Sequence, residues 1–271
     1  MISDSTHNLP FNKYQSNTHS QNGEDGVIDE ILKRLKINDC NENWCVEFGA
    51  WDGKHLSNTF TLVERGWNAI YIEGETDRYN DLLITTKEYP KIIPVNAFVA
   101  RFTSDPSSLD AILSKTNIPS DFVLLSIDID SYDCEVWESL KNYKPMVVVI
   151  EINSSVPPGI VWRHTRNTPL NTFTATCNVG TKKGYTLVCH TGNLIFVRTN
   201  LVSQLNMDQR FIDYPELLFL YDSPWLPERL FEIRRRHPIA RFIPRPLRQA
   251  IVRLIPKPFH PFFMKIYRLF L

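Results

Sequence analysis

Acidic and amide side chains recur in this sequence where its apolar runs end. The set is Glu47, Glu73, Asn96, Asp128, Asp130, Glu151 and Asn153. Runs as continuously apolar as 122–127 and 146–150 predict strands covered on both faces, which is typical of a parallel sheet. Ligands bind such sheets outside the carboxyl ends of the strands. We therefore expect these side chains to gather along one edge of the sheet and to accept hydrogen bonds from a polar ligand.

The stretch from Trp44 to Gly74 predicts a strand, a glycine turn, a helix and a second strand that ends in an acid. Gly49 and Gly53 allow backbone to approach a ligand where a Cβ would collide. Glu73, twenty positions after Gly53, is suited to accept two hydrogen bonds from a ribose diol. This order of elements predicts a nucleotide-binding domain.

Two ligand classes compete for the glycine turn. A dinucleotide places its pyrophosphate on a helix N-terminus, where negative side chains are unfavourable. Here Glu47 and Asp52 flank the turn, and Trp51 replaces the middle glycine of the dinucleotide pattern. Glu47 is costly to bury unpaired, so we expect it to face a polar or cationic partner. The turn favours a ligand with positive charge and no phosphates, such as S-adenosylmethionine with its sulfonium and ammonium groups.

The N-terminal part supplies two further candidate cofactor contacts. Residues 1–19 are polar and are expected to be loosely held. Gln21 and Glu24 then precede an apolar helical face over residues 27–35. Either this is an ordinary capped helix laid against the sheet, or its polar start lies beside the cofactor. Both alternatives stay open from the sequence alone.

The later elements complete the expected fold. Residues 91–96 form a third strand, whose proline favours an edge position. Asn96 at its end is either an adenine contact or a turn residue. Residues 185–191 and 194–198 are strands joined at Gly192 and Asn193, a hairpin signal. We predict an α/β fold: a Rossmann-like, mostly parallel sheet with helices on both faces and a terminal antiparallel hairpin.

Several segments together resemble the FkbM-type branch of class I S-adenosylmethionine methyltransferases. They are SQNGED at 20–25, VEFGAWDG at 46–53, YIE at 71–73, LSIDIDSYD at 125–133 and VVVIE at 147–151. The family usually has glycine where this chain has Ser131. The resemblance implies the class I methyltransferase fold over residues 20–198 and methyl transfer to oxygen on sugars or other natural-product hydroxyls. It implies no metal, and residues 199–271 lie outside it, as a helical, proline-rich, basic extension.

Transfer of a sulfonium methyl requires an aligned oxygen and removal of its proton. Asp130 is the first candidate base, unless it caps the following turn. His164, in the long loop over residues 154–168, is the second, unless it is an ordinary surface-loop histidine between two arginines. Asp128 is assigned to the cofactor. In a metal-assisted alternative, Asp128, Asp130 and Asn153 would converge on Mg²⁺.

Composition narrows the class of protein. The chain has 271 residues, 43% of them hydrophobic, which is enough for one sizeable core. Five scattered cysteines show no paired spacing, and no stretch resembles a signal peptide or a membrane span, so we expect a cytoplasmic protein. An NAD-dependent dehydrogenase or epimerase and a non-catalytic module of the same fold remain as alternatives. The sequence leaves the acceptor and the oligomeric state open.

The last 39 residues differ from the rest. Residues 233–271 hold ten of the 30 lysines and arginines and none of the 30 acids, which leaves 20 basic and 30 acidic groups in residues 1–232. Six prolines between Pro238 and Pro261 exclude one long helix. The segment is either an arm packed on the body or on a second subunit, or a peripheral anchor on an anionic membrane. Its many apolar side chains argue against nucleic-acid binding.

Overall fold

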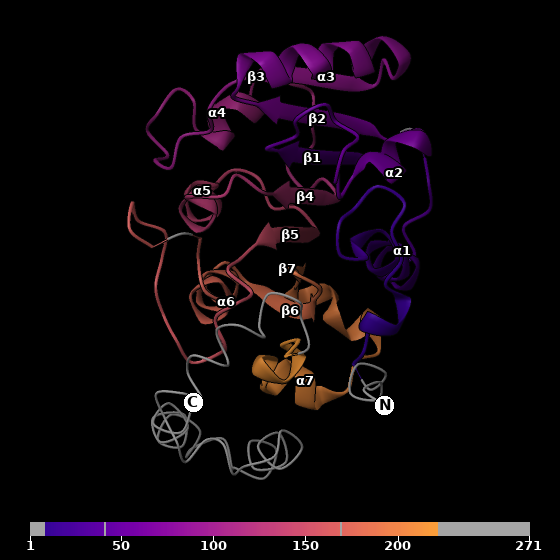
Figure 1. Ribbon diagram of the computed structural model, residues 1–271. Helices are drawn as coiled ribbons and strands as arrows, with labels where there is room; N and C mark the ends of the chain where they lie inside the picture. The colour runs from indigo at the N-terminus through magenta and orange to yellow at the C-terminus, as the bar shows by residue number, and fades with distance from the viewer. Residues whose placement is uncertain (1–8, 41, 169, 222–271) are drawn as a thin grey trace.

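The computed structural model describes residues 9–40, 42–168 and 170–221. Its centre is one seven-stranded sheet (Figure 1). The strands are β1 Trp44–Phe48, β2 Asn68–Glu73, β3 Ile92–Asn96, β4 Leu124–Ile127, β5 Val147–Glu151, β6 Tyr185–His190 and β7 Asn193–Arg198. Their order is β3-β2-β1-β4-β5-β7-β6, and β7 runs antiparallel to both of its neighbours while the other pairs are parallel. The predicted Rossmann-like sheet with a terminal hairpin is confirmed, including the edge position of β3.

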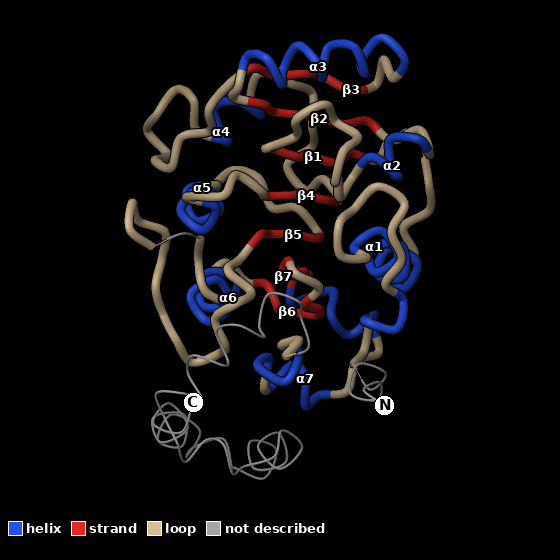
Figure 2. The backbone as a smooth tube through the Cα atoms, viewed as in Figure 1, coloured by secondary structure: helices blue, strands red, loops and turns tan. Residues whose placement is uncertain are grey.

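Helices cover both faces of this sheet (Figure 2). They are α1 Glu24–Arg34, α2 Phe60–Glu64, α3 Thr76–Glu88, α4 Leu109–Leu113, α5 Asp133–Ser139, α6 Phe173–Lys182 and α7 Gln209–Asp213. Among the described residues, the 3-10 helices η2 Asn12–Tyr14, η3 Thr199–Leu205 and η4 Pro215–Leu218 flank them. Figure 1 shows α4, α5 and α6 on one face and α1 and α2 on the other.

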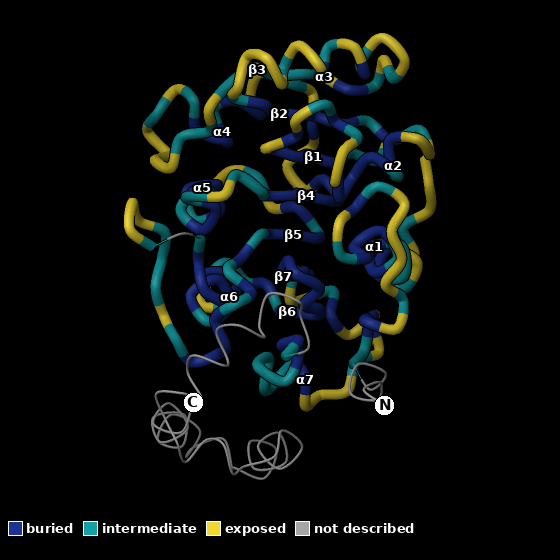
Figure 3. Tube along the Cα trace, in the orientation of Figure 1, coloured by how far each residue is buried: buried dark blue, intermediate teal, exposed yellow. Residues whose placement is uncertain are grey.

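Strand side chains alternate between two apolar cores, as the period of two requires. Val46 and Phe48 of β1 pack toward α4, α5 and α6, whereas Cys45 packs toward α1 and α2. Apart from the edge strand β3, the strands are the most buried part of the described chain (Figure 3). Because both faces are covered, the free polar surface of the sheet is its carboxyl edge, where the site lies.

Three elements differ from the sequence prediction. The helix after the glycine turn begins only at Phe60, because the preceding loop turns its polar groups toward a buried carboxylate. Helix α6 has no counterpart in the prediction, since threonines and Gly180 weaken its helical pattern; Thr172 caps its start. The hairpin turn lies at Thr191 and Gly192, one residue earlier than expected.

The expectation of a loosely held start to the chain is wrong for residues 9–19. Phe11 is fully buried, and the side-chain amide of Asn12 donates to the backbone oxygen of His190 at 2.7 Å. This segment is held by the far end of the sheet, a partner too distant in sequence to be recognised from local composition.

At the other end, residues 199–221 extend both cores: Leu218 is buried in the core that contains Val46 and Phe48, and Leu205 in the core that contains Cys45. The basic extension at 233–271, with its membrane or packed-arm alternatives, lies outside the described residues. Within the described ranges, none of the helices has the length and apolarity needed to cross a bilayer.

Candidate functional site

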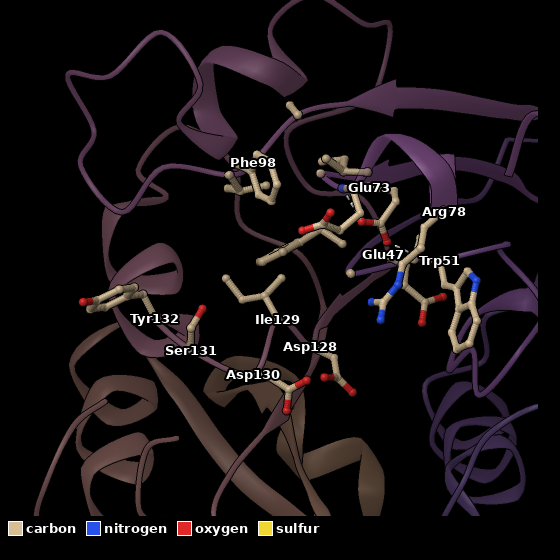
Figure 4. A pocket seen from close by; sticks show the side chains of 18 of the residues that line it. Glu47, Trp51, Glu73, Arg78, Phe98, Asp128, Ile129, Asp130, Ser131 and Tyr132 are labelled. Carbon is tan, nitrogen blue, oxygen red and sulfur yellow. Dashed lines mark hydrogen bonds between the residues drawn. The ribbon is translucent and has the colours of Figure 1, made fainter. Parts of the chain in front are cut away.

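A cavity of about 790 Å³ opens at the carboxyl ends of β1, β2 and β4 (Figure 4). Its walls come from the turn after β1, the end of β2, the loop after β3 and the turn between β4 and α5. Cavities of several hundred Å³ at this edge are the usual ligand sites of such sheets. The sequence-predicted residues that line it are Glu47, Gly49, Glu73, Asp128 and Asp130.

The glycine turn is required by chain packing. Gly49 has φ 79°, and a Cβ there would lie 1.7 Å from the carbonyl oxygen of Asp128. Gly53 has φ 80° and lies against Leu82 and Tyr71, away from the cavity. The close approach that these glycines permit is therefore between segments of this chain, although we expected it to be toward a ligand.

Asp52 also has a local role in the structure. Its carboxylate accepts hydrogen bonds from the backbone N–H groups of Lys54 and His55, at 2.9 and 2.8 Å. It thereby holds the loop that follows the turn and does not line the cavity.

Glu47 points to the face of the sheet that carries α2. Its carboxylate accepts from the hydroxyls of Ser57 and Thr59 at 2.6 and 2.5 Å, and from the backbone N–H of Asn58 at 3.0 Å. Burial raises the pKa of Glu47, and these donors oppose that rise. The polar partner expected for Glu47 is therefore present: it is the non-helical loop before α2.

Glu73 ends β2 at the middle of the cavity wall. Its two carboxylate oxygens accept from the backbone N–H groups of Trp51, at 2.9 Å, and Glu75, at 2.8 Å. Each oxygen keeps a free lone pair for a ligand. Asn96 donates to the backbone oxygen of Glu73 at 2.9 Å and lies outside the cavity lining, so its contact with adenine stays a prediction.

Three carboxylates converge at the ends of β4 and β5. The ligand atoms of Asp128, Asp130 and Glu151 lie within 4.8 Å of one another. Burial, followed by the neighbouring carboxylates, raises the pKa of both Asp128 and Glu151. The trio predicted for Mg²⁺ had Asn153 in place of Glu151, and the Asn153 side chain accepts hydrogen bonds from the N–H and the hydroxyl of Ser155. Such a group has the chemistry to hold a proton, an ammonium group or an oxygen-preferring cation.

The turn that carries Asp130 is held by the side chain of Asp133. Asp130 has φ 56°, in the left-handed region. Asp133, fully buried at the start of α5, accepts from the N–H groups of Ile129 and Ser131 at 3.0 Å each. Burial raises the pKa of Asp133 to about 6. These contacts on both sides of Asp130 fix the direction in which its carboxylate leaves the backbone.

His164 lies behind the cavity wall. Its ring packs edge-on against Tyr132, with centroids 4.8 Å apart, and its Nδ1 accepts from the N–H of Leu170 at 3.2 Å. Tyr132 lines the cavity and His164 does not. Asp130 therefore lines the cavity, whereas Tyr132 lies between His164 and the cavity.

Gln21 and Glu24 lie away from the cavity. Glu24 is fully buried and accepts from Thr191 Oγ1 at 2.6 Å and from Asn193 Nδ2 at 3.2 Å. Gln21 is exposed, and its backbone oxygen accepts from Asn17. Glu24 thus ties α1 to the terminal hairpin, which supports the capped-helix alternative.

Part of the cavity wall was not predicted from the sequence. It comprises Phe98, Arg101, Tyr132 and Arg78, and also Trp51, which stands out in the sequence only as a departure from a glycine pattern. Phe98 is 71% exposed and its ring lies over Gly74, where a Cβ would be 2.4 Å away. These residues come from loops and a first helical turn, so no periodic pattern marks them. An exposed aromatic residue after a predicted strand was the one available signal.

Comparisons with known proteins add solved structures of low similarity. No protein-family model matches the chain, and no curated protein sequence matches it. The CMeT domain of the citrinin polyketide synthase is 14% identical, with a TM-score of 0.44, over 67% of this chain and 54% of that chain. A TehB-like SAM-dependent methyltransferase from Corynebacterium glutamicum is 11% identical (TM-score 0.37; 62% of this chain, 87% of that one). The N-terminal domain of EvdMO1 with SAH bound is 9% identical (TM-score 0.41; 69% and 81%).

The chain thus spans about half the length of the first of these structures. All three TM-scores lie below 0.5. We therefore draw the function from the residues of the cavity alone.

Proposed function

We propose that this protein is an S-adenosylmethionine-dependent methyltransferase that acts on a hydroxyl group of a sugar, a glycan or another small metabolite. The observation that carries this proposal is the position of Glu73. Its carboxylate stands at the end of β2, in the wall of the cavity, and keeps lone pairs free for the two hydroxyls of a ribose.

The residues present suit a cationic nucleoside better than a dinucleotide. A pyrophosphate needs a helix N-terminus directly behind the glycine turn. Here Gly53 is followed by a non-helical loop, and α2 starts only at Phe60 and has five residues. The acids Asp128 and Asp130 on the same cavity favour positive charge. The cavity therefore fits S-adenosylmethionine and disfavours NAD.

When bound, S-adenosylmethionine supplies a methyl group activated by its positively charged sulfur. The chain has to hold the acceptor hydroxyl in line and take its proton. Asp130 is the proposed base, because its carboxylate is exposed and lines the cavity in a turn that Asp133 holds rigid. Alignment of the acceptor hydroxyl contributes more to the rate than proton removal does, since the methyl group is already activated.

The cofactor part of the proposal is tested by titration calorimetry with S-adenosylhomocysteine. Wild type is expected to bind, and Glu73→Gln is expected to bind about 10- to 100-fold more weakly, because an amide offers one acceptor oxygen in place of two. Equal affinity of the two proteins would contradict the assignment of Glu73.

The reaction is tested with methyl-deuterated S-adenosylmethionine and a panel of free sugars, glycans and phenolic or aliphatic hydroxyl compounds, together with amines and compounds that offer a nucleophilic carbon. Mass spectrometry should detect a labelled methyl ether on at least one of them. Labelled methyl on nitrogen or carbon compounds only would keep the enzyme class and overturn the hydroxyl acceptor.

A further inference from the structure

Arg78 lines the cavity, yet neither the packing of the fold nor the proposed reaction gives its side chain a role. It lies in the first turn of α3, directly after the strand that ends in Glu73, and it lines the cavity. Its guanidinium carbon is 4.9 Å from the centroid of the Trp51 ring. Figure 4 shows the guanidinium reaching into the cavity beside Trp51, between Glu73 and Asp128. The face of the Trp51 ring attracts the positive charge of the Arg78 guanidinium and holds it at the cavity.

In the described part of the chain, the Arg78 guanidinium has no ion pair or hydrogen bond with protein. By contrast, Arg34, Arg65, Arg163 and Arg210 each pair with a carboxylate. The nearby Glu73 carboxylate is oriented by two backbone N–H groups. Arg78 therefore presents planar N–H donors, the geometry that suits a carboxylate, to whatever occupies the cavity.

The cavity lining thus carries the guanidinium of Arg78 among acids that include Glu73, Asp128 and Asp130. The amino-acid end of S-adenosylmethionine carries a carboxylate beside an ammonium and a sulfonium. The two cationic groups suit the acids, and its carboxylate would be repelled by them. We propose that Arg78, held on Trp51, forms the subsite for the cofactor carboxylate; this inference rests on the proposed function.

The test compares two ligands that differ in one group. S-adenosylhomocysteine and its decarboxylated analogue, in which the amine is kept, are titrated calorimetrically into the full chain. Arg78→Gln is expected to weaken binding of S-adenosylhomocysteine about tenfold and to leave affinity for the decarboxylated analogue unchanged. Arg78→Lys should recover part of the loss, since it keeps the charge without the planar fork.

Arg101 provides the matched control. It also lines the cavity and also stacks on rings, with its guanidinium carbon 4.4 Å from the centroid of Tyr132. Arg101→Gln should leave the ratio of the two affinities at the wild-type value. Melting of the unliganded variants should match wild type, because Arg78 is exposed and anchors no other element.

The outcomes separate the two claims. If wild type binds neither ligand, the proposed function is wrong and the subsite falls with it. If wild type binds S-adenosylhomocysteine and Arg78→Gln binds it equally well, or loses both ligands by the same factor, the cofactor stands and the carboxylate subsite is wrong.

Discussion

The acids at the carboxyl edge of the sheet differ in which groups lie against their carboxylates. Glu47, Glu73 and Asp133 accept hydrogen bonds from N–H and O–H groups of this chain, and each thereby fixes a loop at the cavity. Asp128 and Glu151 lie instead against other carboxylates, which is unfavourable when all are charged. The acids that accept hydrogen bonds from this chain shape the cavity. Those that lie against other carboxylates are available to hold a proton or a cation.

Asp130→Asn is the direct test of the proposed base. Asparagine tolerates the left-handed backbone at this position and is nearly isosteric, so the turn should be kept. Turnover is expected to fall about 10²- to 10⁴-fold, while affinity for S-adenosylhomocysteine changes only a few-fold. The measurement is release of S-adenosylhomocysteine in the presence of an acceptor from the panel. Wild-type turnover would assign proton removal to His164 or to water.

The carboxylate cluster predicts a pH dependence of stability. Burial raises the pKa of Asp128 above its ordinary value, so the folded state binds a proton that the unfolded state releases. Such a group contributes its full stabilisation below the ordinary pKa of about 4 and loses it as pH rises through the raised value. The free energy of unfolding should therefore fall from about pH 4 toward neutral pH.

Asp128→Asn should remove about 1–3 kcal/mol of that fall. Urea titrations of wild type and variant at pH 4.5 and pH 8 measure it. Parallel pH profiles for the two proteins would show that Asp128 titrates normally.

At the scale of elements, the β1 turn and the β4–α5 turn depend on each other. A Cβ on Gly49 would meet the carbonyl oxygen of Asp128, and φ is also positive there. Gly49→Ala is expected to lower the free energy of unfolding by more than about 2 kcal/mol and to displace the turn that carries Asp130.

Gly184→Ala is the matched control. Gly184 has a similar φ of 81°, yet its added Cβ would have only Lys144 Nζ nearby, at 3.7 Å. It should lose about 1–2 kcal/mol from backbone strain alone. Equal losses in urea denaturation would mean that the contact between the two turns relaxes freely.

The elements differ in how far the sequence predicts them. The strands follow from apolar runs, and the edge position of β3 follows from its proline, whereas those runs do not predict the order of the remaining parallel strands. The acids at the carboxyl edge are predicted from the positions at which the same apolar runs end. By contrast, α6 carries weak helix formers, and Phe98 and Arg101 lie on a loop without periodicity. The loop over residues 54–59 is uncoiled because Glu47 is buried against it, a tertiary effect that local pattern does not contain.

At the scale of the whole molecule, the basic extension at 233–271 remains a prediction. Each basic side chain near an anionic bilayer contributes about 1 kcal/mol, so half of the ten suffice for peripheral binding. The full chain should co-sediment with anionic vesicles at low salt and not with neutral ones. Replacing Arg234, Arg235 and Arg236 by glutamine should weaken that binding. A full chain that ignores anionic vesicles would support an arm packed on the body or on a second subunit.

The central claim is that this cavity binds S-adenosylmethionine and not a dinucleotide, and thermal melting tests it most directly. At a concentration about 100-fold above its Kd, a ligand adds about 2.7 kcal/mol of stability. For a chain of this size that corresponds to a rise in Tm of about 5–10 °C. S-adenosylhomocysteine should produce this rise and NAD should not. A rise with NAD alone, or with neither ligand at saturating concentration, would contradict the account.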